Sequence, residues 1–97
     1  MKRDDVIHIL HKQKSDLFRQ YPIASLSVFG SVARDEAGPD SDVDILVEFS
    51  QPVGLFQFID LQQQLEKAMG CRVDLGTPRS LKPRLKDSVI KEAMRVV

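Results

Sequence analysis

The sequence predicts an α/β domain with a small mixed sheet of three or four strands, backed by helices. Three short apolar segments have strand character, and they alternate with segments whose apolar residues recur at helical spacing. Gly, Pro and Ser separate these segments, as at Gly38-Pro39 and over residues 50–54. A chain of 97 residues can bury one hydrophobic core, so we expect a single domain over residues 1–97.

Apolar periodicity places seven elements along the chain. They are a helix over 4–20, a strand over 23–29, a short helix over 31–37, a strand over 42–49, a helix over 55–69, a strand over 71–75 and a last helix from Ser80 to Val96.

Local signals set several boundaries. We expect Asp4 or Asp5 to cap the first helix, Gly70 to end the third and Ser80 to cap the last. Phe56 is expected at the surface. The predicted buried stripes of the third and last helices are Leu55, Phe58, Ile59, Leu65 and Met69, and Leu81, Leu85, Val89, Ala93 and Val96.

The composition is that of a globular domain, with 42% hydrophobic and 29% charged residues. The net charge of zero argues against non-specific nucleic-acid binding, although residues 35–66 carry eight acids and no base between basic flanks. Cys71 is the single cysteine, which fits a reducing cytosol. No apolar run is long enough to cross a membrane and no leader is recognisable, so a cytoplasmic location is expected.

Two aspartates stand at the mouth of the second strand. Because side chains alternate along a strand, Asp42 and Asp44 point to one face, while Val43, Ile45 and Val47 point to the other. Neighbouring like charges repel and do not stabilise a sheet. A divalent cation would remove that repulsion, and carboxylate oxygens suit Mg²⁺.

The turn at the end of the first predicted strand could bind a phosphate beside these aspartates. Gly30 allows close backbone approach, and the Ser31 hydroxyl adds a donor where a short helix opens. A phosphate on this turn and a metal on the carboxylates together indicate metal-assisted phosphoryl or nucleotidyl transfer.

Gly30-Ser31, followed after ten residues by Asp42-x-Asp44, resembles the signature of the nucleotidyltransferase superfamily typified by DNA polymerase beta. The Gly-Ser-x-Ala-Arg form and Ser-Asp-x-Asp-Ile-Leu-Val are most similar to its smallest branch. That branch comprises the minimal nucleotidyltransferases (MNT) of bacterial and archaeal toxin–antitoxin pairs. The resemblance covers residues 22–97 and implies the nucleotidyltransferase fold for this core.

The resemblance also implies the metal ligands. Asp74, on the strand over residues 71–75, would complete a site for two Mg²⁺ ions with Asp42 and Asp44. A structural alternative is that Asp74 pairs with Arg72, its neighbour on the same face.

The nucleotide contacts follow from the same resemblance. Gly30 and Ser31 would hold the β- and γ-phosphates of ATP, and Arg34 lies where a cation could reach a phosphate. The alternative for Arg34 is a surface ion pair with Asp35 or Glu36.

The implied activity is antitoxin activity by AMP transfer. A helical toxin with a HEPN-type ribonuclease domain would receive AMP on a tyrosine hydroxyl and be silenced. Two other readings stay open. One is an antitoxin that blocks the toxin by binding alone, and the other is a nucleotidyltransferase that acts unaided on small molecules.

Overall fold

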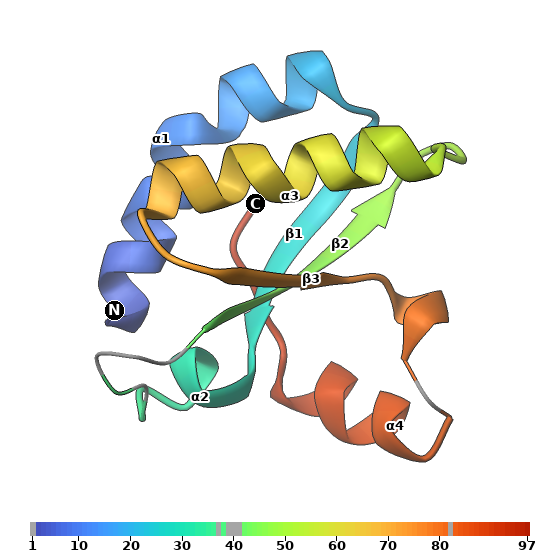
Figure 1. Ribbon diagram of the computed structural model, residues 1–97. Helices are drawn as coiled ribbons and strands as arrows, with labels where there is room; N and C mark the ends of the chain where they lie inside the picture. The colour runs from blue at the N-terminus through green and yellow to red at the C-terminus, as the bar shows by residue number, and fades with distance from the viewer. Residues whose placement is uncertain (1, 37, 39–41, 82) are drawn as a thin grey trace.

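The computed structural model describes residues 2–36, 38, 42–81 and 83–97. Its elements are, in chain order, α1 (Arg3–Gln20), β1 (Ile23–Phe29), α2 (Gly30–Ala33), β2 (Val43–Phe49), α3 (Leu55–Met69), β3 (Val73–Gly76), the 3₁₀ helix η1 (Pro78–Ser80), α4 (Pro83–Glu92) and β4 (Met94–Arg95). In Figure 1, α1 and α3 lie above the sheet, and α2 and α4 lie below it. Within the described ranges, no helix is both long and apolar enough to cross a membrane.

The sheet is mixed, as predicted, and has the strand order β3-β2-β1-β4. β1 pairs antiparallel with both β2 and β4, whereas β2 and β3 run parallel. This order places the start of β2 between the start of β3 and the end of β1. The segments that carry the predicted site therefore meet at one end of the sheet.

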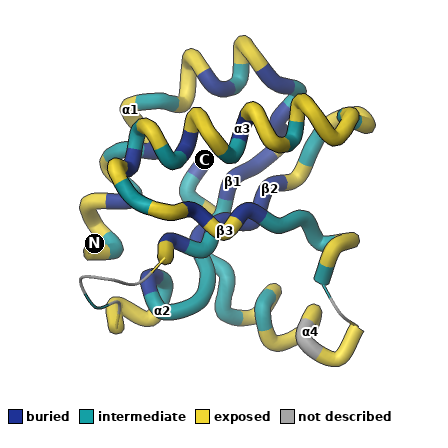
Figure 2. Tube along the Cα trace, in the orientation of Figure 1, coloured by how far each residue is buried: buried dark blue, intermediate teal, exposed yellow. Residues whose placement is uncertain are grey.

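The core lies between the sheet and the helices α1 and α3. Val43, Ile45 and Val47 are fully buried on the helix-facing side of β2, which confirms the predicted alternation. Figure 2 shows burial concentrated in the strands and in the inner faces of these two helices. The helices contribute Val6, Leu10, Leu17, Leu61, Leu65 and Met69.

α3 has the predicted bounds, but its buried stripe differs. Gly70 ends it in the left-handed conformation with φ of 71°, and Phe56 is 88% exposed, both as predicted. Leu55 and Ile59 were predicted to be buried and are instead 70% and 39% exposed. Leu55 is the first residue of the helix, and Ile59 lies about a third of a turn from the centre of the stripe that faces the sheet.

Several boundaries before β3 are shifted. α1 begins at Arg3 with Lys2 at the N-cap and no side-chain cap, so Asp4 and Asp5 lie in the first turn instead. The predicted helix over 31–37 is the single turn α2, and residue 37 lies outside the described residues. The strand predicted over 71–75 is β3, which begins two residues later.

The C-terminal segment contradicts the prediction of one long helix to Val96. Ser80 closes a capping box with Thr77 in η1 instead of capping α4, and Pro83 opens α4. β4 then pairs with β1, and the Val96 N–H donates to the Leu26 carbonyl at 2.9 Å. The free edge of β1 offers hydrogen bonds that a longer helix would leave unmade, so pairing overrides the helical periodicity.

A polar contact joins α1 to α3 at the edge of the core. Tyr21 directly follows α1 and is only 4% exposed. Its hydroxyl donates a hydrogen bond to the Asp60 carboxylate on α3. Burial raises the pKa of Tyr21 to about 12, and the hydrogen bond and charge of Asp60 add to the rise.

This contact predicts an alkaline transition. Between pH 10 and 12 the unfolded chain loses the phenolic proton and the folded chain keeps it, so stability falls as pH rises through this range. Tyr21 is the single tyrosine, so phenolate absorbance reports it alone, with a midpoint near pH 12 in the folded state. Tyr21→Phe should lower stability by about 1 kcal/mol at neutral pH. A folded-state midpoint near pH 10 would contradict the buried contact.

Candidate active site

The three predicted aspartates lie at the neighbouring starts of β2 and β3. Asp44 pairs with Asp74 in the parallel register, so both side chains project from the same face of the sheet. The two carboxyl groups are close enough for the charge of Asp74 to raise the pKa of Asp44. Asp42 lies just before β2, close enough for its charge to act on Asp44. The structure thus brings together the carboxylates that the sequence analysis singled out.

The pKa of Asp44 is raised from its ordinary value of 3.8 to about 6. Burial is the largest cause because it disfavours the charged form, and the charges of Asp74 and Asp42 follow. The charge of Glu92 acts in the same direction. When Asp44 ionises, its negative charge is therefore added to a place that already lies close to other carboxylates. A bound divalent cation reverses such an electrostatic balance.

Gly30 makes room for this arrangement. It has a φ of +70°, and a Cβ built at this position would lie only 2.1 Å from Asp44 Oδ2. Any side chain here would therefore collide with the carboxylate as well as strain the backbone. The sequence analysis assigned to Gly30 a close approach to a ligand. The structure adds a close approach to Asp44.

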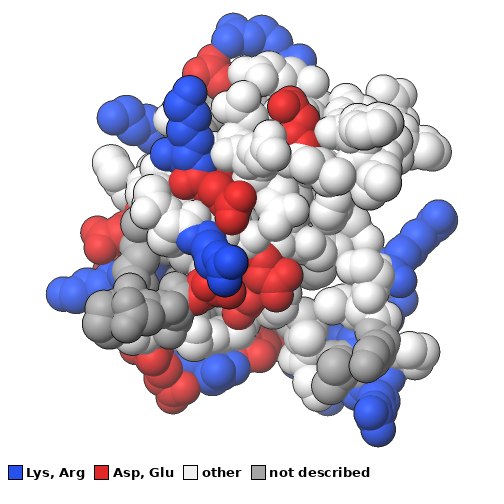
Figure 3. Space-filling view, in the orientation of Figure 1, with Lys and Arg blue, Asp and Glu red and all other residues white. Residues whose placement is uncertain are grey.

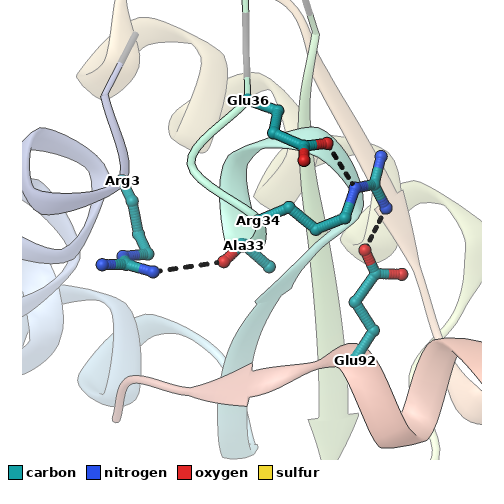
Figure 4. A network of polar contacts seen from close by, with 5 residues as sticks. All are labelled: Arg3, Ala33, Arg34, Glu36 and Glu92. Atoms are coloured by element: carbon teal, nitrogen blue, oxygen red, sulfur yellow. Dashed lines mark hydrogen bonds and ion pairs between the residues drawn. The ribbon is translucent and has the colours of Figure 1, made fainter.

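The other two predicted phosphate-binding residues belong to the turn after Gly30. Ser31 is half-buried in α2, and its hydroxyl has no hydrogen-bond partner among the residues that the structure describes. Arg34 follows α2 and contacts both Glu36, at 3.0 Å from Nε to Oε2, and Glu92 (Figure 4). Hydrogen bonds to Glu36 and Glu92 raise the Arg34 pKa above its ordinary value. A phosphate would have to compete with these carboxylates for the guanidinium.

A hollow of about 330 Å³ opens beside the carboxylates. Arg72 lies in this hollow, but within the described part of the chain it forms no ion pair with Asp74. A larger hollow of about 690 Å³ lies at the opposite end of β2, away from the aspartates, so we assign the chemistry to the smaller one. The smaller hollow is lined by Asp42, Gln62, Glu66, Arg72, Val73 and Asp74.

The aspartates suit a magnesium ion by their donor chemistry. Asp42, Asp44 and Asp74 offer only hard carboxylate oxygens, and their mutual repulsion is the kind that a divalent cation relieves. Across residues 2–36, 38, 42–81 and 83–97, no three His, Cys, Asp or Glu side chains already stand in metal-binding geometry. Asp42 is exposed, and its side chain would have to turn toward the other two for all three to share one ion.

Three residues near the site were not found from the sequence. Gln62 and Glu66, on α3, hydrogen-bond to the backbone of Val73. Their i,i+4 spacing beside a buried stripe is the one signal that could have found them. Glu92 acts on Asp44 and Arg34 from the end of α4, and no local pattern connects it to either.

The raised pKa predicts that Asp44 destabilises the metal-free fold. Its folded-state pKa exceeds the unfolded value, so its effect is to lower stability as pH rises from about 4 through 6. Asp44→Asn should remove this slope and raise stability at pH 7 by about 1 kcal/mol, since partial exposure reduces the effect. Thermal unfolding from pH 4 to 7 measures both. Glu48→Gln, an exposed acid on the same strand, should leave the slope intact.

The Gly30–Asp44 contact can be separated from backbone strain. Gly70→Ala tests strain alone, because φ is +71° and nothing lies within 4 Å of the added Cβ; about 1 kcal/mol should be lost. Gly30→Ala should lose about 1–3 kcal/mol more through the collision. Introducing Asp44→Ala should restore that excess. Equal losses at Gly30 and Gly70 would show that the carboxylate does not fill the space.

Comparison with known proteins agrees with this geometry. The sequence model of the family described as "Nucleotidyltransferase domain" matches residues 10–96. Protein adenylyltransferase MntA of Thermococcus cleftensis is 40% identical over 93 residues, which is 96% of this chain and 94% of the relative.

Two solved structures share the fold. One, provisionally described as a minimal nucleotidyltransferase, has a TM-score of 0.82 and 37% identity, over 97% of this chain and 95% of that one. The other is a tri-AMPylated Shewanella oneidensis HEPN toxin in complex with MNT antitoxin. It has a TM-score of 0.68 and 21% identity, over 98% of this chain and 71% of that one. Together with the match over residues 10–96, these comparisons show that the chain belongs to the nucleotidyltransferase domain family, as a minimal nucleotidyltransferase.

Proposed function

We propose that this chain is a protein adenylyltransferase that acts as an antitoxin. It transfers AMP from ATP to a tyrosine hydroxyl of a HEPN-type toxin. The relative that is 40% identical over 96% of the chain carries the name protein adenylyltransferase, which supports AMP as the transferred group. The complex of an AMPylated HEPN toxin with MNT antitoxin supports the kind of acceptor.

The single observation that carries this proposal is the pairing of Asp44 with Asp74 beside Gly30. The chain keeps a carboxyl group with a raised pKa at this point, packed against a glycine that leaves room for it, and the raised pKa opposes stability. A protein that only bound its partner would have no use for such an arrangement. We therefore favour chemistry over steric blocking.

In the proposed reaction, the tyrosine hydroxyl gives up its proton to water, its oxygen bonds to the α-phosphorus of ATP as the bond to the bridging oxygen breaks, and pyrophosphate leaves. Asp42, Asp44 and Asp74 would hold Mg²⁺, which when bound neutralises charge on the triphosphate and lowers the pKa of the attacking hydroxyl. The Ser31 hydroxyl and the backbone at Gly30 hold the β- and γ-phosphates. Arg34 contributes once a phosphate replaces Glu36 or Glu92 as its partner.

The partner would first meet a charged surface. Figure 3 shows Asp and Glu gathered near the start of β3, and Lys and Arg around α4. The exposed bases of this second region include Arg84, Lys86, Lys91 and Arg95. We propose that these bases steer an acidic partner, so salt should slow the encounter, because exposed charges are screened beyond about 8–10 Å.

Intact mass tests the proposal directly. The HEPN-type protein that co-purifies with the chain should gain the mass of AMP after incubation with ATP and Mg²⁺. The double variant Asp42→Asn/Asp44→Asn should slow this gain by roughly 10²-fold or more, because it removes charge stabilisation at the reacting centre. Glu48→Gln, an exposed neutralisation further along β2, is the matched control and should transfer AMP at the parental rate.

The alternative of binding alone predicts a different result. In that case the double variant would neutralise the toxin as well as the parent does. Neither protein would add mass to it. That outcome would contradict the enzymatic proposal.

A further inference from the structure

β3 is an edge strand of the described sheet, and side chains of α3 occupy its outer side. The Arg72 carbonyl faces β2, where it accepts from the Val43 N–H at 3.0 Å. Because backbone groups alternate along a strand, both polar groups of Val73 face away from β2. Gln62 Nε2 donates to the Val73 carbonyl at 3.0 Å, and Glu66 Oε2 accepts from the Val73 N–H at 3.1 Å.

These two bonds act together on one residue. Gln62 and Glu66 lie one turn apart on α3, so one rigid helix engages both the donor and the acceptor of Val73. They take the place of a further strand at this edge. Val73 is buried and immediately precedes Asp74. Fixing the backbone of Val73 therefore also fixes the register of Asp74 relative to β2.

The position of Asp74 opposite Asp44 needs contacts that hold β3 in register with β2. β3 has four residues, and its partner β2 presents Asp44 directly opposite Asp74. Repulsion between the ionised carboxylates favours sliding or peeling of the edge strand. A slip of two residues would keep Val73's face inward, and it would separate the two aspartates.

We propose that Gln62 and Glu66 are positioning residues that hold Asp74 opposite Asp44 through the backbone of Val73. The inference rests on the proposed function, in which these aspartates bind a divalent cation. It predicts that cation affinity depends on hydrogen bonds formed at the edge of β3 that faces away from β2.

Isosteric exchanges separate hydrogen bonding from packing. Glu66→Gln keeps an oxygen that accepts from the Val73 N–H, so amide exchange at Val73 should stay as slow as in the parent. Gln62→Glu keeps the size but cannot donate to the Val73 carbonyl, so it should behave like Gln62→Ala. In Gln62→Ala/Glu66→Ala, amide exchange at Val73 should quicken. Mn²⁺ affinity of the chain alone, measured by electron paramagnetic resonance, should fall about tenfold or more.

Two further variants distinguish positioning from general loss of stability. Leu65→Val removes buried volume from the same helix without touching either bond, so it should lower the transition temperature but keep Mn²⁺ affinity. In an Asp74→Asn background, the Gln62→Ala/Glu66→Ala changes should weaken Mn²⁺ binding no further, because they act through Asp74.

The outcomes separate the inference from the proposed function. If Asp74→Asn weakens Mn²⁺ binding while the Gln62→Ala/Glu66→Ala variant binds like Leu65→Val, the positioning role is wrong and the metal site stands. The same conclusion holds if the double change weakens binding equally with and without Asp74. If Asp74→Asn binds Mn²⁺ like the parent, the proposed metal site is wrong, and this inference fails with it.

Discussion

Repulsion between carboxylates at the paired starts of β2 and β3 is the constraint on which the site depends. Asp44 is half-buried and close to Asp74 and Asp42, and burial together with their charges raises its pKa to about 6. No packing in the core requires these groups to meet. The sheet nevertheless brings them together through the register of two parallel strands.

The surrounding elements make this arrangement possible in different ways. Gly30 leaves the space that the Asp44 carboxylate occupies, and it accepts a backbone conformation that other residues resist. At the outer edge of β3, Gln62 and Glu66 hydrogen-bond to the backbone of Val73. The buried contacts of α1 and α3 keep the sheet rigid behind the site. Stability supplied by the core thus supports a locally unfavourable cluster at one end.

Local sequence patterns predicted the elements whose contacts are themselves local. β1 and α3 have the expected bounds because apolar periodicity, Pro22 and Gly70 mark them within a few residues. β4 was missed because it forms by pairing with β1, far away in the chain, while its residues continue a helical pattern. Pairing of this kind is decided by the free edge of a sheet, which the periodicity of one segment does not report.

The same distinction applies to the site. The proximity of Asp42 and Asp44 follows from strand alternation, and the meeting of Asp74 with Asp44 was expected only from the family resemblance. The contacts of Arg34 with Glu92 and of Gly30 with Asp44 join different elements, and no spacing in the sequence indicates them. Residues that support a site from neighbouring elements are therefore the ones that sequence analysis misses.

Thermal unfolding with Mg²⁺ at constant ionic strength and pH 8 tests the central claim that this cluster of charges is built for a cation. The account predicts a saturable rise in the transition temperature, worth about 2.7 kcal/mol at a hundredfold excess over Kd. Asp42→Asn/Asp44→Asn should start from an equal or higher transition temperature without Mg²⁺ and show no rise. A parent protein that Mg²⁺ does not stabilise, or an equal rise in the double variant, would contradict the account.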